Sequence, residues 1–222
     1  KMKTIKKSTE KSLINEFILN FERDALKKKS ENKRFSFVLT GGRSPINLYK
    51  KLVKSKVDWR NIDLFWGDER YVSQKSKYSN YKLAYDNLIK KIKISKKNIF
   101  QIDTNKDLLN SSKNYSNKIK KYFRNKKKSF DYFLLGMGAD GHIASIFPHS
   151  HEINEKFIAK QVLRKDFLRI SLSLNIINNS KKIILWLNNS LKSKKYNQLR
   201  LLGKKIPVNN LDKKKTLIFK IS

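Results

Sequence analysis

Cysteine is absent from this sequence of 222 residues, which excludes a disulfide framework, a thiolate nucleophile and a zinc site built from cysteines. Long apolar runs are absent as well. The longest, residues 183–187, has five residues, whereas a helix that crosses a bilayer needs roughly 20. The basic residues 1–6 are not followed by the apolar stretch of a secretory signal. We therefore expect a cytoplasmic protein with no membrane partner.

Flexible linkers and internal repeats are also missing. No segment is rich in glycine and serine or in proline, and the composition does not change along the chain. A chain of this size can bury about 70% of its unfolded surface and so form one hydrophobic core. We expect residues 1–222 to form a single domain.

Acidic residues are scarce, because 18 Asp and Glu stand against 52 Lys and Arg and leave a net charge of +34. Such a charge is typical of proteins that bind nucleic acids or acidic membranes. Nucleic-acid sites usually add arginine forks and aromatic platforms, but nine of these cations are arginines and the aromatic residues fall mainly in candidate strands. We expect salt-sensitive nonspecific binding and no specific nucleic-acid partner.

Strands and helices alternate along the chain. Short β-branched and aromatic runs predict strands, and apolar residues spaced three and four apart predict helices. The candidate strands are residues 35–40, 62–66, 130–135, 167–173, 183–187 and 216–221. The candidate helices are residues 9–29, 80–92, 107–126 and 190–202, with another that Ser44 caps and Pro45 opens. This order predicts an α/β fold, a single layered domain with a mostly parallel, Rossmann-like sheet flanked by helices.

Glycine turns at residues 41–42, 67 and 136–138 each follow a candidate strand. In an open parallel sheet, ligands bind beyond the carboxyl ends of the strands, where such turns gather. We therefore expect a single site at this edge. The charged residues that the turns bring to it are Arg43, Asp68, Arg70, Asp140 and His142.

The first turn, residues 41–45 (Gly-Gly-Arg-Ser-Pro), suits an anion, which its backbone N–H groups, the helix N-terminus and Arg43 would hold. A tight turn without a ligand is the alternative, and the spacing is not that of a P-loop. Residues 136–141 follow the pattern GxGxxG, but no clear acidic residue follows about 20 positions later. We therefore do not expect a dinucleotide.

Asp140 and His142 suit proton transfer, since an imidazole can accept a proton from water while a carboxylate orients the ring. The alternative is a turn residue followed by a surface histidine. His149 and His151 are close in sequence, but the spacing of the three histidines matches no zinc-binding motif. We expect His149 and His151 to lie in a loop and no metal to bind.

Other charged positions have two interpretations each. Residues 68–70 (Asp-Glu-Arg) suit substrate hydroxyl groups or a developing oxyanion, or else form an internal ion pair. Arg169 interrupts an apolar strand, where a buried cation is costly unless it is paired or at an edge, and a phosphate is one candidate partner. Lys192 and Lys194 also fit a solvated helix face.

Together, these motifs resemble the 6-phosphogluconolactonase family. The resemblance rests on residues 37–45 (FVLTGGRSP), 66–72 (WGDERYV) with 79–80, 134–148 (LLGMGADGHIASIFP), 169–171 (RIS) and 206–208 (IPV). It implies hydrolysis of 6-phospho-D-glucono-1,5-lactone to 6-phosphogluconate, the second step of the oxidative pentose phosphate pathway. It also implies a monomer that needs neither a metal nor an organic cofactor.

The resemblance implies a role for each site residue. His142 would activate water with the support of Asp140, and Arg70 and the backbone of Gly41 and Gly42 would stabilise the lactone oxygen. The phosphate would face Arg43, Arg169 and Lys192, although residues 188–190 lack the glycine usual before this lysine and leave Lys194 as an alternative. The substrate-binding residues are Gly41, Gly42, Arg43, Ser44, Asp68, Arg169 and Lys192.

Two alternatives remain. Hexosamine-6-phosphate deaminases share the glycine turn and the Asp-Gly-His element, but they continue with Asn-Glu-Pro where this chain has residues 144–148 (Ala-Ser-Ile-Phe-Pro). They also prefer Asp-Glu-Tyr at residues 68–70, so we favour the lactonase. The other alternative is a basic nucleic-acid-binding protein built on the same fold.

Overall fold

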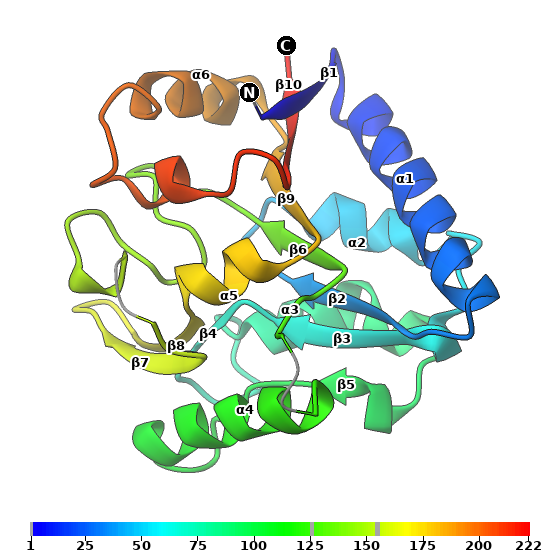
Figure 1. Ribbon diagram of the computed structural model, residues 1–222, viewed down its shortest axis with the longest axis horizontal. Coiled ribbons are helices and arrows are strands. Elements are labelled where there is room, and N and C mark those ends of the chain that lie inside the picture. Colours follow the sequence, from blue (N-terminus) through cyan, green and yellow to red (C-terminus); the bar gives the residue numbers. More distant parts are fainter. Residues whose placement is uncertain (1, 125–126, 154–155) are drawn as a thin grey trace.

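The computed structural model describes residues 2–124, 127–153 and 156–222, so Lys1 and the last two residues of the predicted helix 107–126 lie outside it. Within these residues, seven strands form one parallel sheet (Figure 1). This confirms the predicted α/β class with a mostly parallel sheet. In spatial order the strands are β1 (Lys3–Lys7), β10 (Thr216–Ile221), β9 (Lys182–Leu187), β6 (Tyr132–Leu135), β2 (Phe35–Leu39), β3 (Ile62–Trp66) and β5 (Ile99–Phe100).

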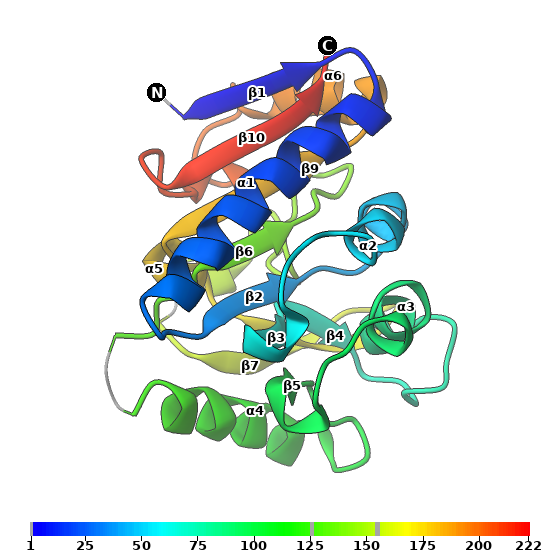
Figure 2. The ribbon, with the colours of Figure 1, turned by 90° about the vertical axis from the view of Figure 1, so that its right-hand side faces the viewer.

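The central strands are buried on both faces. Every residue of β2 and β3 is buried, as is usual for parallel strands that helices cover on both sides. α1 (Glu10–Ser30) crosses one face of the sheet (Figure 2), and α5 (Leu174–Asn179) and α6 (Ser190–Leu199) lie on the other side (Figure 1). The strand ends are therefore the parts of the sheet that a ligand can reach.

α1 follows the predicted helix 9–29 to within one residue at each end. Thr9 caps it, because the Thr9 hydroxyl accepts a hydrogen bond from the backbone N–H of Ser12 at 3.1 Å. One face of the helix is buried against the sheet, as the apolar spacing predicts. The buried residues are Leu13, Ile14, Phe17, Phe21 and Ala25.

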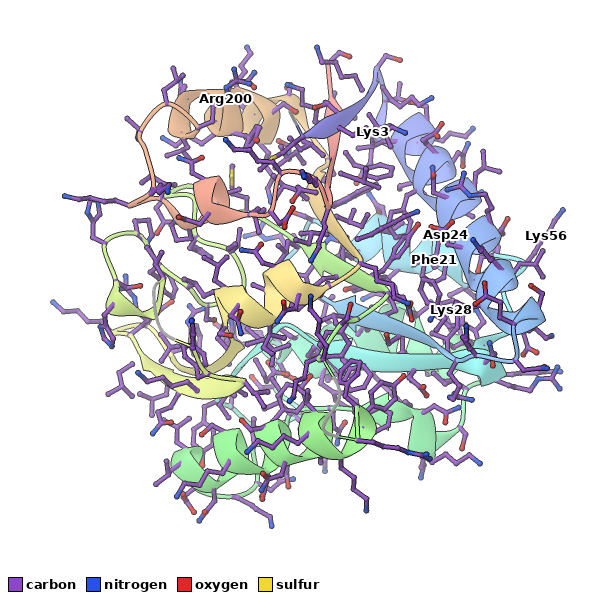
Figure 3. All side chains as sticks on the ribbon, in the orientation of Figure 1. Lys3, Phe21, Asp24, Lys28, Lys56 and Arg200 are labelled. Carbon is purple, nitrogen blue, oxygen red and sulfur yellow. The ribbon has the colours of Figure 1, made fainter. Side chains whose placement is uncertain are left out.

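The labelled cations and the labelled aromatic residue of Figure 3 lie in different parts of the molecule. In Figure 3, Lys3, Lys56 and Arg200 project from the surface, whereas Phe21 lies inside. Phe21 packs on Tyr132 of β6, with 5.7 Å between the ring centroids. The lysine excess therefore does not enter this part of the core.

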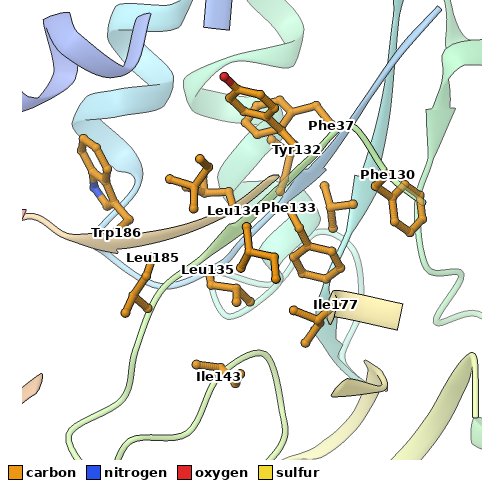
Figure 4. Close-up of a cluster of buried hydrophobic side chains, with 14 of the residues drawn as sticks. Phe37, Phe130, Tyr132, Phe133, Leu134, Leu135, Ile143, Ile177, Leu185 and Trp186 are labelled. Atoms are coloured by element: carbon orange, nitrogen blue, oxygen red, sulfur yellow. The ribbon is translucent and has the colours of Figure 1, made fainter. Parts of the chain in front are cut away.

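The core joins α1 to the middle of the sheet. Phe17 packs edge-on against Tyr132 of β6 and Trp186 of β9, with ring centroids 6.1 and 5.9 Å apart. Phe133 points to the opposite side of β6 from Tyr132, as the alternation of a strand requires (Figure 4). Aromatic pairs of this kind each add about 0.5–1.5 kcal/mol beyond the burial of their surface. They fix the strands whose ends carry the site.

A second, antiparallel sheet was not foreseen in the sequence. Within the described residues it has three strands in the order β4 (Asp68–Arg70), β8 (Leu168–Leu172) and β7 (Ala159–Leu163). Residues 68–70, expected in a turn, pair as β4 with β8, and Arg70 lies directly opposite Arg169. This pairing fixes the relative position of two arginines that are distant in sequence.

Several helix boundaries differ from the prediction. α3 (Asn80–Asn87) ends before residue 92, because Leu88 leaves the helical conformation with φ −135° and ψ −64°, and a 3-10 turn follows. α6 ends at Leu199 rather than at residue 202. α4 (Leu108–Tyr122) starts one residue late, with Asp107 as its cap, and it ends at Tyr122, because the chain forms a turn at residues 123–124.

Ser44 does not cap a helix as expected. α2 (Ile46–Leu52) begins two residues later, after Pro45, and no side chain caps it. Residues 44–45 form a turn before the helix, and the Ser44 hydroxyl accepts a hydrogen bond from the ammonium group of Lys192.

The topology reverses direction at β2. The chain passes from β2 to β3 on one side, and later places β6 on the other side. The crevice beyond the carboxyl ends of the strands at such a switch point is the usual ligand site of an open α/β sheet. The loops after β2, β3 and β6 all open there.

Candidate active site

A single pocket beyond these strand ends is lined by every residue predicted for the site except Asp140. Asp140 lies behind His142 and contacts its ring. The pocket also includes residues that were not predicted for the site. They are Thr40, Asn80, Gly136, Met137, Gly138 and Ala144.

The turn after β6 aligns Asp140 with His142. Nδ1 of His142 lies 2.7 Å from Oδ1 of Asp140, which also accepts a hydrogen bond from the His142 backbone N–H at 3.1 Å. The hydrogen bond with His142 lowers the pKa of Asp140 to about 2, so the carboxylate is ionised at neutral pH. Nδ1 then carries the proton, and Nε2 of a neutral imidazole is left as an acceptor. The pair has the arrangement of an oriented general base.

Glycines and an aromatic ring hold this turn. Gly141 has a φ of +88°, which L side chains rarely adopt, and the His142 ring occupies the space that a Cβ on Gly138 would need. Phe147 packs on the His142 ring with 4.6 Å between centroids. The ring is therefore fixed from two sides, while 30% of the His142 side chain stays exposed.

Asp68 and Glu69 point in different directions. Asp68 lines the pocket and accepts a hydrogen bond from the Ser145 hydroxyl at 2.6 Å. Glu69 turns away and accepts hydrogen bonds from the backbone N–H groups of Asn80 at 2.7 Å and Tyr81 at 2.8 Å. It therefore binds the N-terminus of α3. Burial raises the pKa of Glu69 to about 7, against the lowering effect of these N–H groups.

Arg70 and Arg169 form a pair of cations on neighbouring strands. Arg70 donates to the Tyr78 carbonyl at 2.9 Å, and Arg169 donates to Asp166 at 2.5 Å. The Phe167 ring lies 5.6 Å from the Arg70 guanidinium and 5.8 Å from that of Arg169. Nε of each arginine is buried without a partner among the described residues. Two guanidinium groups with unused donors suit an oxyanion or a phosphate.

Lys192 reaches the pocket from the first turn of α6. Its ammonium group contacts the Ser44 hydroxyl and the Met137 carbonyl, and burial lowers its pKa. Lys194 is exposed and does not line the pocket, so of these two lysines Lys192 is the one that lies at the pocket. Arg43 lies exposed at the rim, beside Gly42, whose φ is +77°.

Sequence reasoning missed three supporting residues. Asn80 lines the pocket, Ser145 holds Asp68, and Phe147 holds His142. All three lie in the segments that carry the family resemblance, but their roles depend on contacts with residues distant in the chain. Periodicity and turn chemistry carry no signal for such contacts.

The remaining histidines lie outside the pocket. His149 has a φ of +59° and its backbone N–H donates to the Lys205 carbonyl, and His151 begins a short 3-10 helix. Among residues 2–124, 127–153 and 156–222, no group of three His, Cys, Asp or Glu side chains could hold a metal ion. Within the same ranges, no helix is both long and apolar enough to span a bilayer.

The fold and pocket define an α/β protein with a cationic site at the carboxyl edge of a parallel sheet. Residues 8–219 match the model of the family described as glucosamine-6-phosphate isomerases/6-phosphogluconolactonase. The chain belongs to this family.

Individual relatives agree with this assignment. A 6-phosphogluconolactonase of Thermotoga maritima is 37% identical over 60% of this chain, and the match spans 59% of that relative, less than two thirds of its length. One from Chlamydia trachomatis is 30% identical over 77% of this chain and 68% of its own length. A crystal structure of the T. maritima enzyme superposes with a TM-score of 0.84 at 26% identity and covers 99% of both chains.

The fold alone does not decide between activities. The structure of a monomeric glucosamine-6-phosphate deaminase superposes with a TM-score of 0.82 at 18% identity, covering 99% of this chain and 97% of its own. The activity must therefore be argued from the residues of the pocket.

Proposed function

We propose that this protein hydrolyses 6-phospho-D-glucono-1,5-lactone to 6-phosphogluconate, the second step of the oxidative pentose phosphate pathway. The observation that carries the proposal is the convergence of the His142–Asp140 pair and three partly or fully buried cations on one pocket. The relatives named 6-phosphogluconolactonase support it.

His142 acts as the general base. Its Nε2 accepts a proton from water as the water oxygen attacks the lactone carbonyl, while ionised Asp140 stabilises the imidazolium that forms. The proton then passes to the ring oxygen when its bond to the carbonyl carbon breaks, and the ring opens. A lactone is an activated ester, so no covalent nucleophile is needed.

Arg70 and the backbone N–H groups of Gly41 and Gly42 stabilise the oxyanion of the tetrahedral intermediate. Donors aimed at a developing charge commonly contribute about 10²- to 10³-fold in rate. The unpartnered Nε of Arg70 supports this role, since it leaves a buried donor free for the substrate.

Arg43, Arg169, Lys192 and Ser44 bind the phosphate. Its charge is remote from the reacting carbon, so this binding energy orients the ring without taking part in bond cleavage. Asp68, held by Ser145, accepts a hydrogen bond from the substrate. We further propose that residues 1–222 form one domain, which acts as a monomer and has no specific nucleic-acid partner.

The test compares two substrates with the purified protein. We expect it to accelerate opening of the phospholactone above the spontaneous rate, and to release no ammonia from glucosamine 6-phosphate. Ammonia release without acceleration of lactone opening would instead assign the deaminase reaction.

A further inference from the structure

Asn80 lines the pocket, yet no step of the proposed mechanism uses it. It is the first residue of α3 and is 3% exposed. Nδ2 of Asn80 lies 3.0 Å from the Asp68 carbonyl and 3.3 Å from Asp68 Oδ1. Both of these atoms accept hydrogen bonds, so the NH₂ group must face them and Oδ1 must face the other way.

Oδ1 of Asn80 is therefore a buried acceptor without a partner among the described residues. Leaving such an atom unpaired is unfavourable, and a bound ligand that donated a hydrogen bond to it would remove this cost. The charged side chains around it are mostly cations that donate. The acceptor thus matches a part of the ligand that the cations do not bind.

The chemistry of the proposed substrate limits what that part can be. The phosphate and the lactone carbonyl accept hydrogen bonds, whereas the hydroxyl groups of the ring can donate them. The two carboxylate oxygens of Asp68 already have partners. Oδ1 faces the Asn80 NH₂ group, and Oδ2 accepts a hydrogen bond from the Ser145 hydroxyl. Asn80 Oδ1 is accordingly an uncharged acceptor available to a ring hydroxyl.

The amide is held in place before any ligand binds. The backbone N–H of Asn80 donates to buried Glu69 at 2.7 Å, which fixes the start of α3. On its other side, Oδ1 of the amide lies against Gly41, in the space that a Cβ there would need, so the absence of that Cβ lets the two segments pack together. A fixed acceptor loses little conformational entropy on binding and can discriminate well between ligands.

We propose that Asn80 is a specificity-determining residue whose Oδ1 accepts a hydrogen bond from one hydroxyl group of the sugar ring. The inference rests on the proposed function and adds to it a substrate requirement, a donor at one ring position. A phospholactone that lacks this hydroxyl should bind and react less well.

The experiment is a cycle of enzyme variants against substrate analogues. kcat/KM is measured for wild type and Asn80→Ala with the parent phospholactone and with its 2-deoxy, 3-deoxy and 4-deoxy analogues. We expect about a tenfold loss for wild type with one analogue, and a similar loss for Asn80→Ala with the parent. With that analogue, Asn80→Ala should lose nothing further. If the loss caused by Asn80→Ala and the loss caused by the missing hydroxyl group multiply for all three analogues, the proposal is wrong.

Two controls separate specificity from folding. Asn87→Ala removes an asparagine of the same helix that bonds the Leu83 carbonyl outside the pocket, and it should keep the wild-type preference among the analogues. If Asn80→Ala does not fold, Asn80→Ser is measured and judged by the same criterion. Wild type that opens none of the phospholactones would refute the proposed function, whereas multiplying losses in an active enzyme refute only the role of Asn80.

Discussion

At the scale of single residues, the site depends on the protonation of one histidine and its partner. Asp140 is ionised because the hydrogen bond with His142 lowers its pKa to about 2. It therefore accepts the Nδ1 proton of His142 and leaves Nε2 as the acceptor for water. The two side chains meet because Gly141 between them has a φ of +88°.

His142→Ala should lower kcat by about 10²- to 10⁴-fold, because general-base catalysis is lost. The fold should survive, since the His142 side chain is partly exposed. Lactone hydrolysis and thermal unfolding measure the two effects. His149→Ala is the matched control and should turn over like wild type, since His149 is exposed in the following loop. Turnover close to wild type in His142→Ala would remove the general-base assignment.

Arg169→Ala should raise KM by about 10- to 100-fold and leave kcat nearly unchanged, because a phosphate contact binds the ground state and the transition state alike. Steady-state kinetics separates the two constants. Arg60→Ala, which removes the same charge at the opposite end of β3, should change neither. A defect confined to kcat would place Arg169 at the reacting carbon instead.

The residues in glycine turns could be predicted from the sequence, since a parallel sheet collects the turns after its strands at one edge. Lys192 could not be chosen over Lys194 that way, because both lie on the same helix and only the packing of α6 decides which one is buried. The position of Asn80 in the pocket could not be predicted for a similar reason. Its contact with Asp68 depends on how α3 docks.

At the scale of elements, the main sheet was predictable and the small sheet was not. β2 (FSFVL) and β3 (IDLFW) are rich in aromatic and aliphatic residues, with one polar residue each, and they are bounded by turns, which is a strong strand signal. β4 has three residues, Asp-Glu-Arg, too few and too polar to show any alternation. β1, with the sequence KTIKK, forms an edge of the sheet, and its three lysines leave too few apolar residues to indicate a strand. Tertiary pairing, not local pattern, makes both segments strands.

Protonation of Glu69, which binds the N-terminus of α3, makes the stability of the protein depend on pH. The folded protein holds the Glu69 proton up to about pH 7, whereas an unperturbed glutamate releases it near 4.5. Between these values the folded state binds more protons, so the Glu69 contribution to the free energy of unfolding falls as the pH rises. The stability of wild type relative to Glu69→Gln should therefore decrease by about 3 kcal/mol from pH 4.5 to pH 7 and stay level above.

Urea unfolding of both proteins across this range measures that difference. Glu31→Gln serves as the control, since Glu31 is exposed and its pKa is lowered rather than raised. It should not show a decrease over the same interval. A relative stability of wild type that rose with pH would mean that Glu69 is ionised in the folded protein throughout.

At the scale of the whole molecule, the net charge of +34 surrounds a pocket that is itself cationic. Exposed lysines occur along the whole described part of the chain, among them Lys3 and Lys56, which are labelled in Figure 3, so the charge is spread over the surface. Such a field attracts anionic ligands over distances set by the salt concentration. The composition predicts this behaviour directly, since it does not depend on the fold.

Raising the ionic strength from about 10 mM to about 300 mM should lower kcat/KM for the phospholactone by about 3- to 10-fold, while kcat at saturation stays constant. Gluconolactone without the phosphate carries no charge and is the matched control, so any turnover of it should depend little on salt. An equal salt dependence for the two lactones would show that the field of the protein does not guide the substrate.

The central claim is that this pocket opens a phosphorylated lactone, and the most direct measurement is the initial rate of lactone loss as protein is added. After subtraction of spontaneous opening, we predict a rate that is proportional to protein concentration and saturates with substrate. A rate indistinguishable from that of buffer alone, with folded protein present, would contradict the account.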